Sequence, residues 1–388
     1  MAASTREGVP RAACCQAAHR VILFLHNRYR TTGGEERAVD DLAWLVREHL
    51  GEDAEVLTRD SGASGRGHAA AGLLRGGVDP DDVARAVRRT RARVVHAHNL
   101  LPQFGWRALA AAREAGARVV VHLHNYRLVC AVAVCFTRGE ECTRCHGRYT
   151  WPGIRLNCRG NRAEAAAYGA SLALWQRRMA AQADAFIVPS AFALQRLREL
   201  RAPLGERVTV VPHVVRAVAS APRFDAAGPA LVTSRLAPEK GIDVAIDACR
   251  SAGLPLVIAG DGPLDAELRA HAAGADVRFA GRVPEDELER LRAAASVAIV
   301  PSRSGETFGL AAAEAMARGL PVAATRIGAL PELVPADQLA PPGDAGALGD
   351  LAARLRANEA AARAGLEAVA RVAAPEVVAR ALASVYDA

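Results

Sequence analysis

Short runs of β-branched and aliphatic residues alternate along this chain with longer stretches rich in Ala, Leu and Arg, and the alternation occurs in two series. In the first series we expect strands at 21–25, 54–57, 93–97, 118–123, 185–188 and 208–211. In the second we expect strands at 230–234, 255–260, 277–281, 297–301 and 321–325. Strands that alternate with helices form parallel sheets covered on both faces. The sequence therefore predicts an α/β protein with two Rossmann-like doubly wound domains facing each other across a cleft.

The boundary between the two series falls in residues 216–230, which are rich in Ala, Pro and Gly and show no clear period. A length of 388 residues also suits two cores better than one. We expect the following division: a flexible tail at 1–19, an N-terminal domain at 20–216, a C-terminal domain at 217–372, and a last helix at 373–388 that packs back on the N-terminal domain.

Composition narrows the class of protein. Hydrophobic residues make up 51% and charged residues 23% of the chain, which is typical of a globular protein. No apolar run reaches the roughly 20 residues that span a bilayer, and residues 1–20 lack the continuous apolar stretch of a secretory signal. We therefore expect a cytoplasmic protein, whose eight cysteines are thiols or metal ligands rather than a disulfide framework.

The charge of +7 is divided unevenly, with net +12 in residues 1–216 and net −5 in residues 217–388. A basic N-terminal half favours an anionic acceptor, a membrane surface or nucleic acid, although a solvated arginine-rich surface is equally consistent with the count. Among the 49 basic residues Lys240 is the one lysine. We interpret it as a position where a compact ammonium serves and a guanidinium does not.

The segment 301–334 carries the strongest chemical signal. Glu306 lies in a loop after a strand, and Glu314 lies on the following helix, about 12 Å further along its axis. Two carboxylates at that separation suit different hydroxyls of one extended ligand. The backbone N–H groups near Phe308–Leu310, where the helix begins, suit a phosphate. The alternative is that Glu314 is an ordinary helix carboxylate and Glu306 caps the turn.

A second segment, 234–243, follows the first strand of the C-terminal domain. Arg235 and Lys240 stand five residues apart across a turn that contains proline, so both side chains can reach one diphosphate. Such a pair neutralises the charge of a leaving group. The alternative is a solvated basic turn.

Two glycine turns and one histidine complete the candidate site. Gly33 and Gly34 occupy a strand-to-helix loop, and the AGDGPL turn holds Gly260 and Gly262 after another strand. Glycine lets a ligand approach the backbone closely. His124 ends a strand at the expected cleft and can donate to a substrate hydroxyl, whereas the neighbouring His96 and His98 are weaker candidates.

Five cysteines fall between residues 130 and 158. Cys142 and Cys145 have the spacing of a metal knuckle, and Cys130 and Cys158 complete a candidate four-thiolate zinc site. Cys135 is then an extra member. The segment is either a zinc-stapled or reduced structural loop, or a lid that shapes the choice of acceptor.

These segments together resemble glycosyltransferase family four, the retaining sugar-nucleotide transferases of GT-B fold. The resemblance runs from about residue 20 to the C-terminus and is most specific in the E-x7-E signature from Glu306 to Glu314. It is supported by SRLAPEKG around Lys240, by the GGEE loop, by AGDGPL, and by a cysteine-rich insert at 130–158 like that of a subset of the family. His213 is a departure, because the family usually has asparagine there.

The resemblance implies a role for each of these residues. Arg235 and Lys240 hold the donor diphosphate and act in catalysis with Glu306 and His124. Glu314 binds the ribose. The remaining donor contacts implied are Gly33, Gly34, Gly260, Gly262, Arg282, Val283 and the backbone of Phe308, Gly309 and Leu310.

The function so implied is retaining transfer of a hexose from a nucleotide sugar, with UDP or GDP as the carrier, to a hydroxyl acceptor. The acceptor classes are a cell-surface glycan, a lipid-linked sugar and a secondary metabolite. The N-terminal domain then takes the acceptor and the C-terminal domain takes the donor nucleotide. No cofactor is expected for catalysis and no nucleic acid as partner, while the basic N-terminal domain suggests peripheral contact with the inner face of a membrane.

Two other functions remain open at this point. A GT-B phosphorylase would bind pyridoxal phosphate on Lys240 and give the pure protein a visible absorbance band. A basic nucleic-acid-binding protein with a zinc knuckle would show salt-sensitive binding without affinity for sugar nucleotides.

Overall fold

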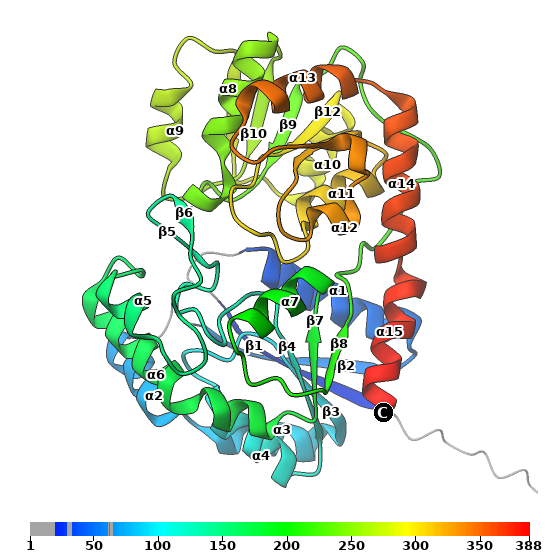
Figure 1. Cartoon of the computed structure of the whole chain (residues 1–388). Coiled ribbons are helices and arrows are strands. Elements are labelled where there is room, and N and C mark those ends of the chain that lie inside the picture. The colour runs from blue at the N-terminus through cyan, green and yellow to red at the C-terminus, as the bar shows by residue number, and fades with distance from the viewer. Residues whose placement is uncertain (1–19, 29–32, 61, 63–64) are drawn as a thin grey trace, which may run out of the picture.

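The computed structural model describes residues 20–28, 33–60, 62 and 65–388, so the expected tail at 1–19 lies outside the described residues. The chain forms two α/β domains, one above the other in Figure 1, and each is built around a six-stranded parallel sheet. The prediction of an α/β protein with two doubly wound domains is confirmed.

The N-terminal sheet has the strand order β2-β1-β3-β4-β7-β8. All six strands coincide with predicted runs: β1 (Val21–Arg28), β2 (Asp53–Asp60), β3 (Ala92–Ala97), β4 (Arg118–His122), β7 (Ala185–Val188) and β8 (Val208–Val210). Successive side chains of a strand point to opposite faces of its sheet. Leu23 therefore packs with the α3 and α4 side of the core, and Phe24 packs with the α1 side.

Helices cover both faces of this sheet. They are α1 (Gly34–His49), α2 (Arg66–Arg75), α3 (Pro80–Thr90), α4 (Gly105–Glu114), α6 (Arg162–Gln182) and α7 (Ala191–Glu199). The longest of these, α6, is capped at its N-terminus by Asn161, whose side chain accepts a hydrogen bond from the backbone N–H of Glu164. None of the described helices is long and apolar enough to cross a bilayer.

The C-terminal sheet repeats the scheme with the order β11-β10-β9-β12-β13-β14. Its strands are β9 (Ala230–Thr233), β10 (Leu256–Ala259), β11 (Val277–Gly281), β12 (Val297–Val300), β13 (Val322–Thr325) and β14 (Leu339–Ala340). Its helices are α8 (Ile242–Ala252), α9 (Asp265–His271), α10 (Glu285–Ala293), α11 (Leu310–Ala317), α12 (Leu330–Leu333), α13 (Ala345–Leu355) and α14 (Glu359–Ala373). Two 3₁₀ turns complete it, η1 (Pro238–Lys240) and η2 (Ala336–Gln338).

The last helix, α15 (Pro375–Asp387), returns to the N-terminal domain (Figure 1). Val378, Leu382 and Tyr386 are buried with α1 and with one face of the N-terminal sheet. The hydroxyl of Tyr386 lies 2.7 Å from Nδ1 of His96. Because α14 belongs to the C-terminal core, the α14–α15 pair joins the two domains along one side.

The cysteine-rich segment lies between β4 and α6. It contains a two-stranded antiparallel hairpin, β5 (Phe136–Thr137) and β6 (Glu140–Glu141), followed by the short helix α5 (Trp151–Arg155). Figure 1 shows the hairpin reaching from the N-terminal domain to the C-terminal domain. The sequence did not predict these strands, because two-residue strands carry no periodic pattern.

Candidate functional site

A cavity of about 480 Å³ lies between the two domains, at the carboxyl ends of their strands. His124 lines it, and so does every predicted donor residue except Gly262: Gly33, Gly34, Arg235, Lys240, Gly260, Arg282, Val283, Glu306, Phe308, Gly309, Leu310 and Glu314. Gly262 instead lets its turn pack against the chain, because a Cβ there would lie 2.4 Å from the carbonyl oxygen of Leu236. The structure thus gathers motifs that are up to 281 residues apart into one cavity.

Lys240 and Glu306 meet in this cavity. Nζ of Lys240 lies 2.6 Å from Oε1 of Glu306, and the hydroxyl of Ser302 donates to the same oxygen at 2.5 Å. Burial acts to raise the pKa of Glu306, but Lys240 and these hydrogen bonds outweigh it and hold the pKa below its usual range. Glu306 is therefore a carboxylate at neutral pH.

The turn that carries Lys240 is shaped by glycine. Gly241 has a φ of 64°, and a Cβ there would lie 2.2 Å from the carbonyl oxygen of Pro301. This close approach brings η1 against the loop that holds Glu306. Arg235 lines the same cavity and pairs with the buried Glu239 four residues later. Both basic groups predicted to hold a diphosphate thus border one space.

Glu314 is held between two arginines that the sequence did not single out. Arg292 donates to Oε2 of Glu314, and Nε of Arg37 lies 3.0 Å from Oε1. Burial raises the pKa of Glu314 above its usual range in spite of both guanidinium groups. Arg37 comes from α1 of the N-terminal domain and also pairs with Glu285. Nothing in the sequence marks these two arginines, since each occupies an ordinary helix position.

The start of α11 faces the glycine loop of the other domain. Gly309 precedes the helix with a φ of 95°, a conformation that L side chains rarely adopt. A Cβ on Gly34 would lie 3.6 Å from the side chain of Leu310, so the two loops approach closely across the cleft. The first N–H groups of a helix have no partner within the helix and attract anions.

Buried histidines extend from this cavity into the N-terminal domain. His124 stacks on His122 with ring centroids 4.1 Å apart and on His213 at 5.0 Å. Nδ1 of His98 lies 2.6 Å from Nε2 of His124, and the ring of His96 lies 4.4 Å from that of His98. Register explains the cluster, because β3 and β4 are neighbours and present alternate residues to the same face. His213 continues the stack.

One of the two close groups of histidines, His122 with His124 and His213, does not have the geometry of a metal centre. Two groups of three histidines each have ring nitrogens within 4.8 Å of one another. One group is His96, His98 and His122, and the other is His122, His124 and His213. In the second group the rings are within 14° of parallel. The lone pairs of stacked imidazoles lie in parallel planes and do not converge on one ion.

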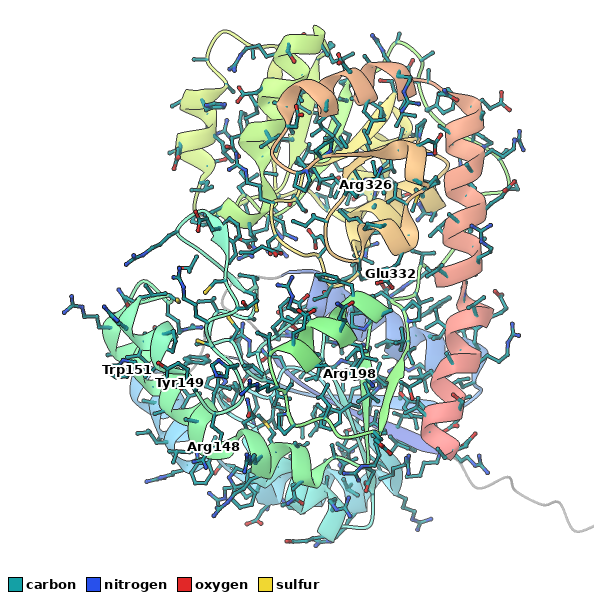
Figure 2. The ribbon with its side chains drawn as sticks, viewed as in Figure 1. Arg148, Tyr149, Trp151, Arg198, Arg326 and Glu332 are labelled. Atoms are coloured by element: carbon teal, nitrogen blue, oxygen red, sulfur yellow. The ribbon has the colours of Figure 1, made fainter. Side chains whose placement is uncertain are left out.

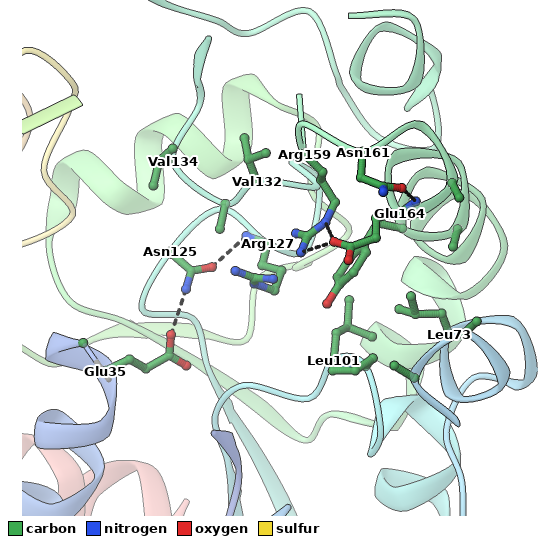
Figure 3. Close-up of a pocket in the computed structure, with 18 of the residues that line it drawn as sticks. Glu35, Leu73, Leu101, Asn125, Arg127, Val132, Val134, Arg159, Asn161 and Glu164 are labelled. Carbon is green, nitrogen blue, oxygen red and sulfur yellow. Dashed lines mark hydrogen bonds and ion pairs between the residues drawn. The ribbon is translucent and has the colours of Figure 1, made fainter. Parts of the chain in front are cut away.

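A second cavity, of about 640 Å³, adjoins the first and shares Glu35, Asn125 and Arg235 with it. Figure 3 shows its polar side, where Asn125 donates to Glu35 at 2.9 Å and Arg159 pairs with Glu164. Its other side is formed by small and aliphatic side chains of α2 and α6 and by the loop at Leu101. The cavity therefore offers both a polar and an apolar surface.

The hairpin of the insert holds the loop that carries Glu306. The carboxylate of Glu141 accepts a hydrogen bond from the backbone N–H of Gly305 at 2.7 Å. The hydroxyl of Ser304 donates to the carbonyl of Val134 at 3.1 Å. The insert thus contacts the candidate site directly.

The insert's cysteines surround a small cavity of about 20 Å³, lined by Cys130, Cys135, Cys142, Cys145 and Cys158. A hydrogen bond with Cys135 lowers the pKa of Cys130 to about 6. No carboxylate lines this cavity, and thiolate donors suit zinc. In the part of the chain that the structure describes, however, only histidines form groups of three metal-ligand atoms within 4.8 Å of one another. The cysteine sulfur atoms form no such group there. The thiols therefore have the right chemistry without forming a closed tetrahedral site.

Two protein-family models match this chain and show which family it belongs to. Residues 11–213 match the family described as "Glycosyl transferase 4-like domain", and residues 229–358 match "Glycosyl transferases group 1". The first match covers more than half of the chain, so the chain belongs to the glycosyl transferase 4-like family. With the two parallel-sheet domains, this makes it a GT-B glycosyltransferase, as the sequence predicted.

Particular relatives match over shorter stretches. A sulfoquinovosyl transferase of Arabidopsis thaliana is 32% identical over 170 residues, which is 40% of this chain and 33% of that protein. A GDP-mannose-dependent alpha-(1-6)-phosphatidylinositol dimannoside mannosyltransferase of Mycobacterium tuberculosis is 43% identical over 109 residues, or 26% of this chain and 28% of that one. The matches therefore span about a third or less of these relatives.

Solved structures share the fold over nearly the whole chain. Sucrose-phosphate synthase from Thermosynechococcus elongatus has a TM-score of 0.69 at 18% identity, covering 95% of this chain and 98% of that one. Anabaena HepE in complex with UDP-glucose has a TM-score of 0.62 at 18% identity, covering 95% and 100%. At these identities the likeness establishes the fold.

Proposed function

We propose that this chain is a retaining glycosyltransferase that moves a hexose from a nucleoside-diphosphate sugar to an acceptor hydroxyl. One observation carries the proposal: Lys240, Arg235, Glu306, Glu314 and the start of α11 line a single cavity between the domains. Two cations and a helix N-terminus suit a diphosphate, and two separate carboxylates suit the hydroxyls of a ribose and a sugar.

In this reaction the acceptor oxygen forms a bond to the anomeric carbon while the bond from that carbon to the diphosphate oxygen breaks. A phosphate oxygen takes the acceptor's proton, and attack on the face of the leaving group retains the configuration. Arg235, Lys240 and the start of α11 stabilise the charge that develops on the diphosphate. This assigns the stabilisation to groups already placed in the cavity.

We assign Glu306 to binding rather than to nucleophilic attack. Its pKa lies below its usual range, and one of its oxygens already accepts from Lys240 and Ser302. A carboxylate held in this way is a weak base and a weak nucleophile. It is well suited to accept hydrogen bonds from the donor sugar.

We place the acceptor in the second cavity, which opens into the donor cavity at Glu35, Asn125 and Arg235. His124 borders the donor cavity from the N-terminal side and would contact the transferred sugar. The relatives that support a nucleotide-sugar donor are the GDP-mannose-dependent mannosyltransferase and the HepE structure with UDP-glucose. A UDP- or GDP-hexose is the expected donor.

The test is a thermal-shift screen of UDP-, GDP- and dTDP-sugars, followed by hydrolysis and transfer assays with the sugar that binds. At least one donor should raise the melting temperature of the wild type but not that of Lys240→Ala. Arg278→Ala, an exposed arginine on β11, is the matched control and should behave as wild type. Failure of every nucleotide sugar to bind would contradict the proposal, and NMR of the product's anomeric carbon tests retention.

We also propose that Cys130, Cys142, Cys145 and Cys158 hold a structural zinc that fixes the insert. The supporting observation is that their side chains surround one cavity without a carboxylate. Zinc would cross-link the segment that holds the Glu306 loop through Glu141. Metal analysis of the purified chain should give one zinc per chain, lost in Cys145→Ser, whereas metal-free protein would contradict the site.

A further inference from the structure

The exposed large hydrophobic side chains gather on one surface of the N-terminal domain. Of five such side chains in the described residues, Leu74, Tyr149, Trp151 and Leu174 lie on α2, on α6 and at the α5 end of the insert. Each is between 50% and 58% exposed, whereas the fifth, Val210 on the edge strand β8, is 36% exposed. Contiguous exposed apolar side chains mark contact surfaces.

Hydrogen bonds bring together the segments that carry Leu74, Tyr149 and Leu174. The indole N–H of Trp175 on α6 donates to the carbonyls of Leu73 and Leu74, which ties α2 to the part of α6 that holds Leu174. Nε of Arg148 donates to the carbonyl of Ala173 at 2.6 Å, which places the adjoining Tyr149 beside the same turn. Figure 2 places Arg148, Tyr149 and Trp151 together at the outer edge of the domain. We call the surface formed by Leu74, Tyr149, Trp151, Leu174 and the exposed positions of α6 the α6 surface.

The charge of the α6 surface has one sign. Residues 142–182 contain seven arginines and one acidic residue, Glu164, which pairs with Arg159 beside the second cavity. The exposed positions of α6 are Arg162, Ala163, Ala166, Leu174, Arg177, Arg178 and Ala181. Over the described part of the chain, no ion pair joins a carboxylate to Arg148, Arg155, Arg162, Arg177 or Arg178.

We propose that the α6 surface binds an anionic lipid bilayer, with α6 lying along the interface. Trp and Tyr prefer the boundary between water and acyl chains, and arginines on a helix attract anionic headgroups while their stems cover apolar surface. An exposed helix face made of alanine, leucine and arginine fits such a boundary. A protein partner would be expected to offer carboxylates to this face, and a nucleic acid would leave Trp151, Leu74 and Leu174 without an apolar environment.

This orientation would bring the second cavity to the bilayer. Ala163 and Ala167 of α6 and Leu73 of α2 line that cavity, and the same two helices carry the α6 surface. An acceptor with an acyl or polyprenyl chain would then reach the cavity from the membrane with its sugar end first. This consequence rests on the proposed function, whereas membrane binding itself does not.

The experiment is sedimentation of the full chain with vesicles of phosphatidylcholine alone or of phosphatidylcholine mixed with phosphatidylglycerol, at low and high salt. Binding should require phosphatidylglycerol and weaken with salt. Arg148→Glu/Arg177→Glu should lower the partition coefficient by about tenfold or more. Arg278→Glu/Arg371→Glu, the same charge change at exposed sites of the C-terminal domain, should bind as wild type.

A second pair of changes tests the apolar contribution independently of charge. Leu174→Ser/Leu74→Ser should also reduce vesicle binding, while Val210→Ser should not. An unchanged melting temperature and circular dichroism spectrum in each variant would show that loss of vesicle binding is not loss of the fold. Equal binding to both kinds of vesicle, wild-type binding by both α6-surface variants, or retention on nucleic acid but not on vesicles would overturn the proposal.

Discussion

Acid is expected to unfold the N-terminal domain, because the domain holds five buried and uncharged histidines. His96, His98, His122, His124 and His213 are between 0% and 7% exposed. Burial lowers the pKa of His96 to about 3 and that of His213 to about 4, and it lowers the pKa of the other three well below the usual range. None of the ion pairs in the described residues involves these five rings.

The sign and size of the effect follow from proton linkage. In the unfolded chain each histidine has a pKa near 6.5, so below that pH the unfolded state binds protons that the native state does not. The free energy of unfolding therefore falls as the pH falls. From about pH 7 to pH 5.5 each histidine removes about 1.3 kcal/mol, and the five together remove about 6 kcal/mol. That is a large part of the roughly 5–15 kcal/mol that stabilises a typical domain.

Tryptophan fluorescence during urea unfolding measures this loss, because all four tryptophans lie in the N-terminal domain, at positions 44, 106, 151 and 175. His122→Phe keeps an aromatic ring in the stack but removes one titrating group. It should reduce the loss of unfolding free energy between pH 7 and pH 5.5 by about 1.3 kcal/mol, whereas His68→Asn, at an exposed position on α2, should leave that loss unchanged. A free energy of unfolding that stays constant from pH 7 to pH 5.5 would refute the reasoning.

Three further substitutions test the cleft. Glu314→Gln leaves two arginines without their shared carboxylate, so the free energy of unfolding in urea should drop by about 3 kcal/mol and donor binding should weaken in a titration. Gly260→Ala would place a Cβ 1.8 Å from a backbone oxygen, at a φ of 147°, and should lower stability by about 3 kcal/mol or more in thermal unfolding. Glu141→Ala removes the acceptor that holds the Glu306 loop and should slow transfer about tenfold at an unchanged melting temperature. Glu140→Ala is its control; equal rates in the two variants would contradict that role.

The inner strands of both sheets were the easiest to predict from the sequence, because strands that are buried on both sides appear as short aliphatic runs. All eleven predicted strands are present. The missed strands, β5, β6 and β14, have two residues each, which is too short for any pattern. The β5–β6 turn also depends on Arg138 and Gly139 at positive φ, and arginine does not signal that conformation.

The sequence indicated each motif of the candidate site, but it did not indicate which side chains of different motifs form ion pairs with one another. Lys240 and Glu306 each stood out, yet no spacing rule indicates that side chains 66 residues apart form an ion pair. Arg37 and Arg292 gave no signal, because helix arginines are common in this chain. The histidine cluster, by contrast, did give a signal in the sequence. His96 and His98 are two residues apart, and so are His122 and His124, so each pair points to one face of its strand. Because the two strands are neighbours, the four rings meet on the same face.

The most direct test of the donor cavity is turnover of the nucleotide sugar that the thermal-shift screen identifies. Sugar release by Lys240→Ala should fall by at least about 100-fold relative to wild type, because the cation facing the diphosphate is removed. Arg278→Ala should match wild type, and circular dichroism should show the same fold in all three proteins. Wild-type turnover by a folded Lys240→Ala protein would contradict the assignment of this cavity to the donor.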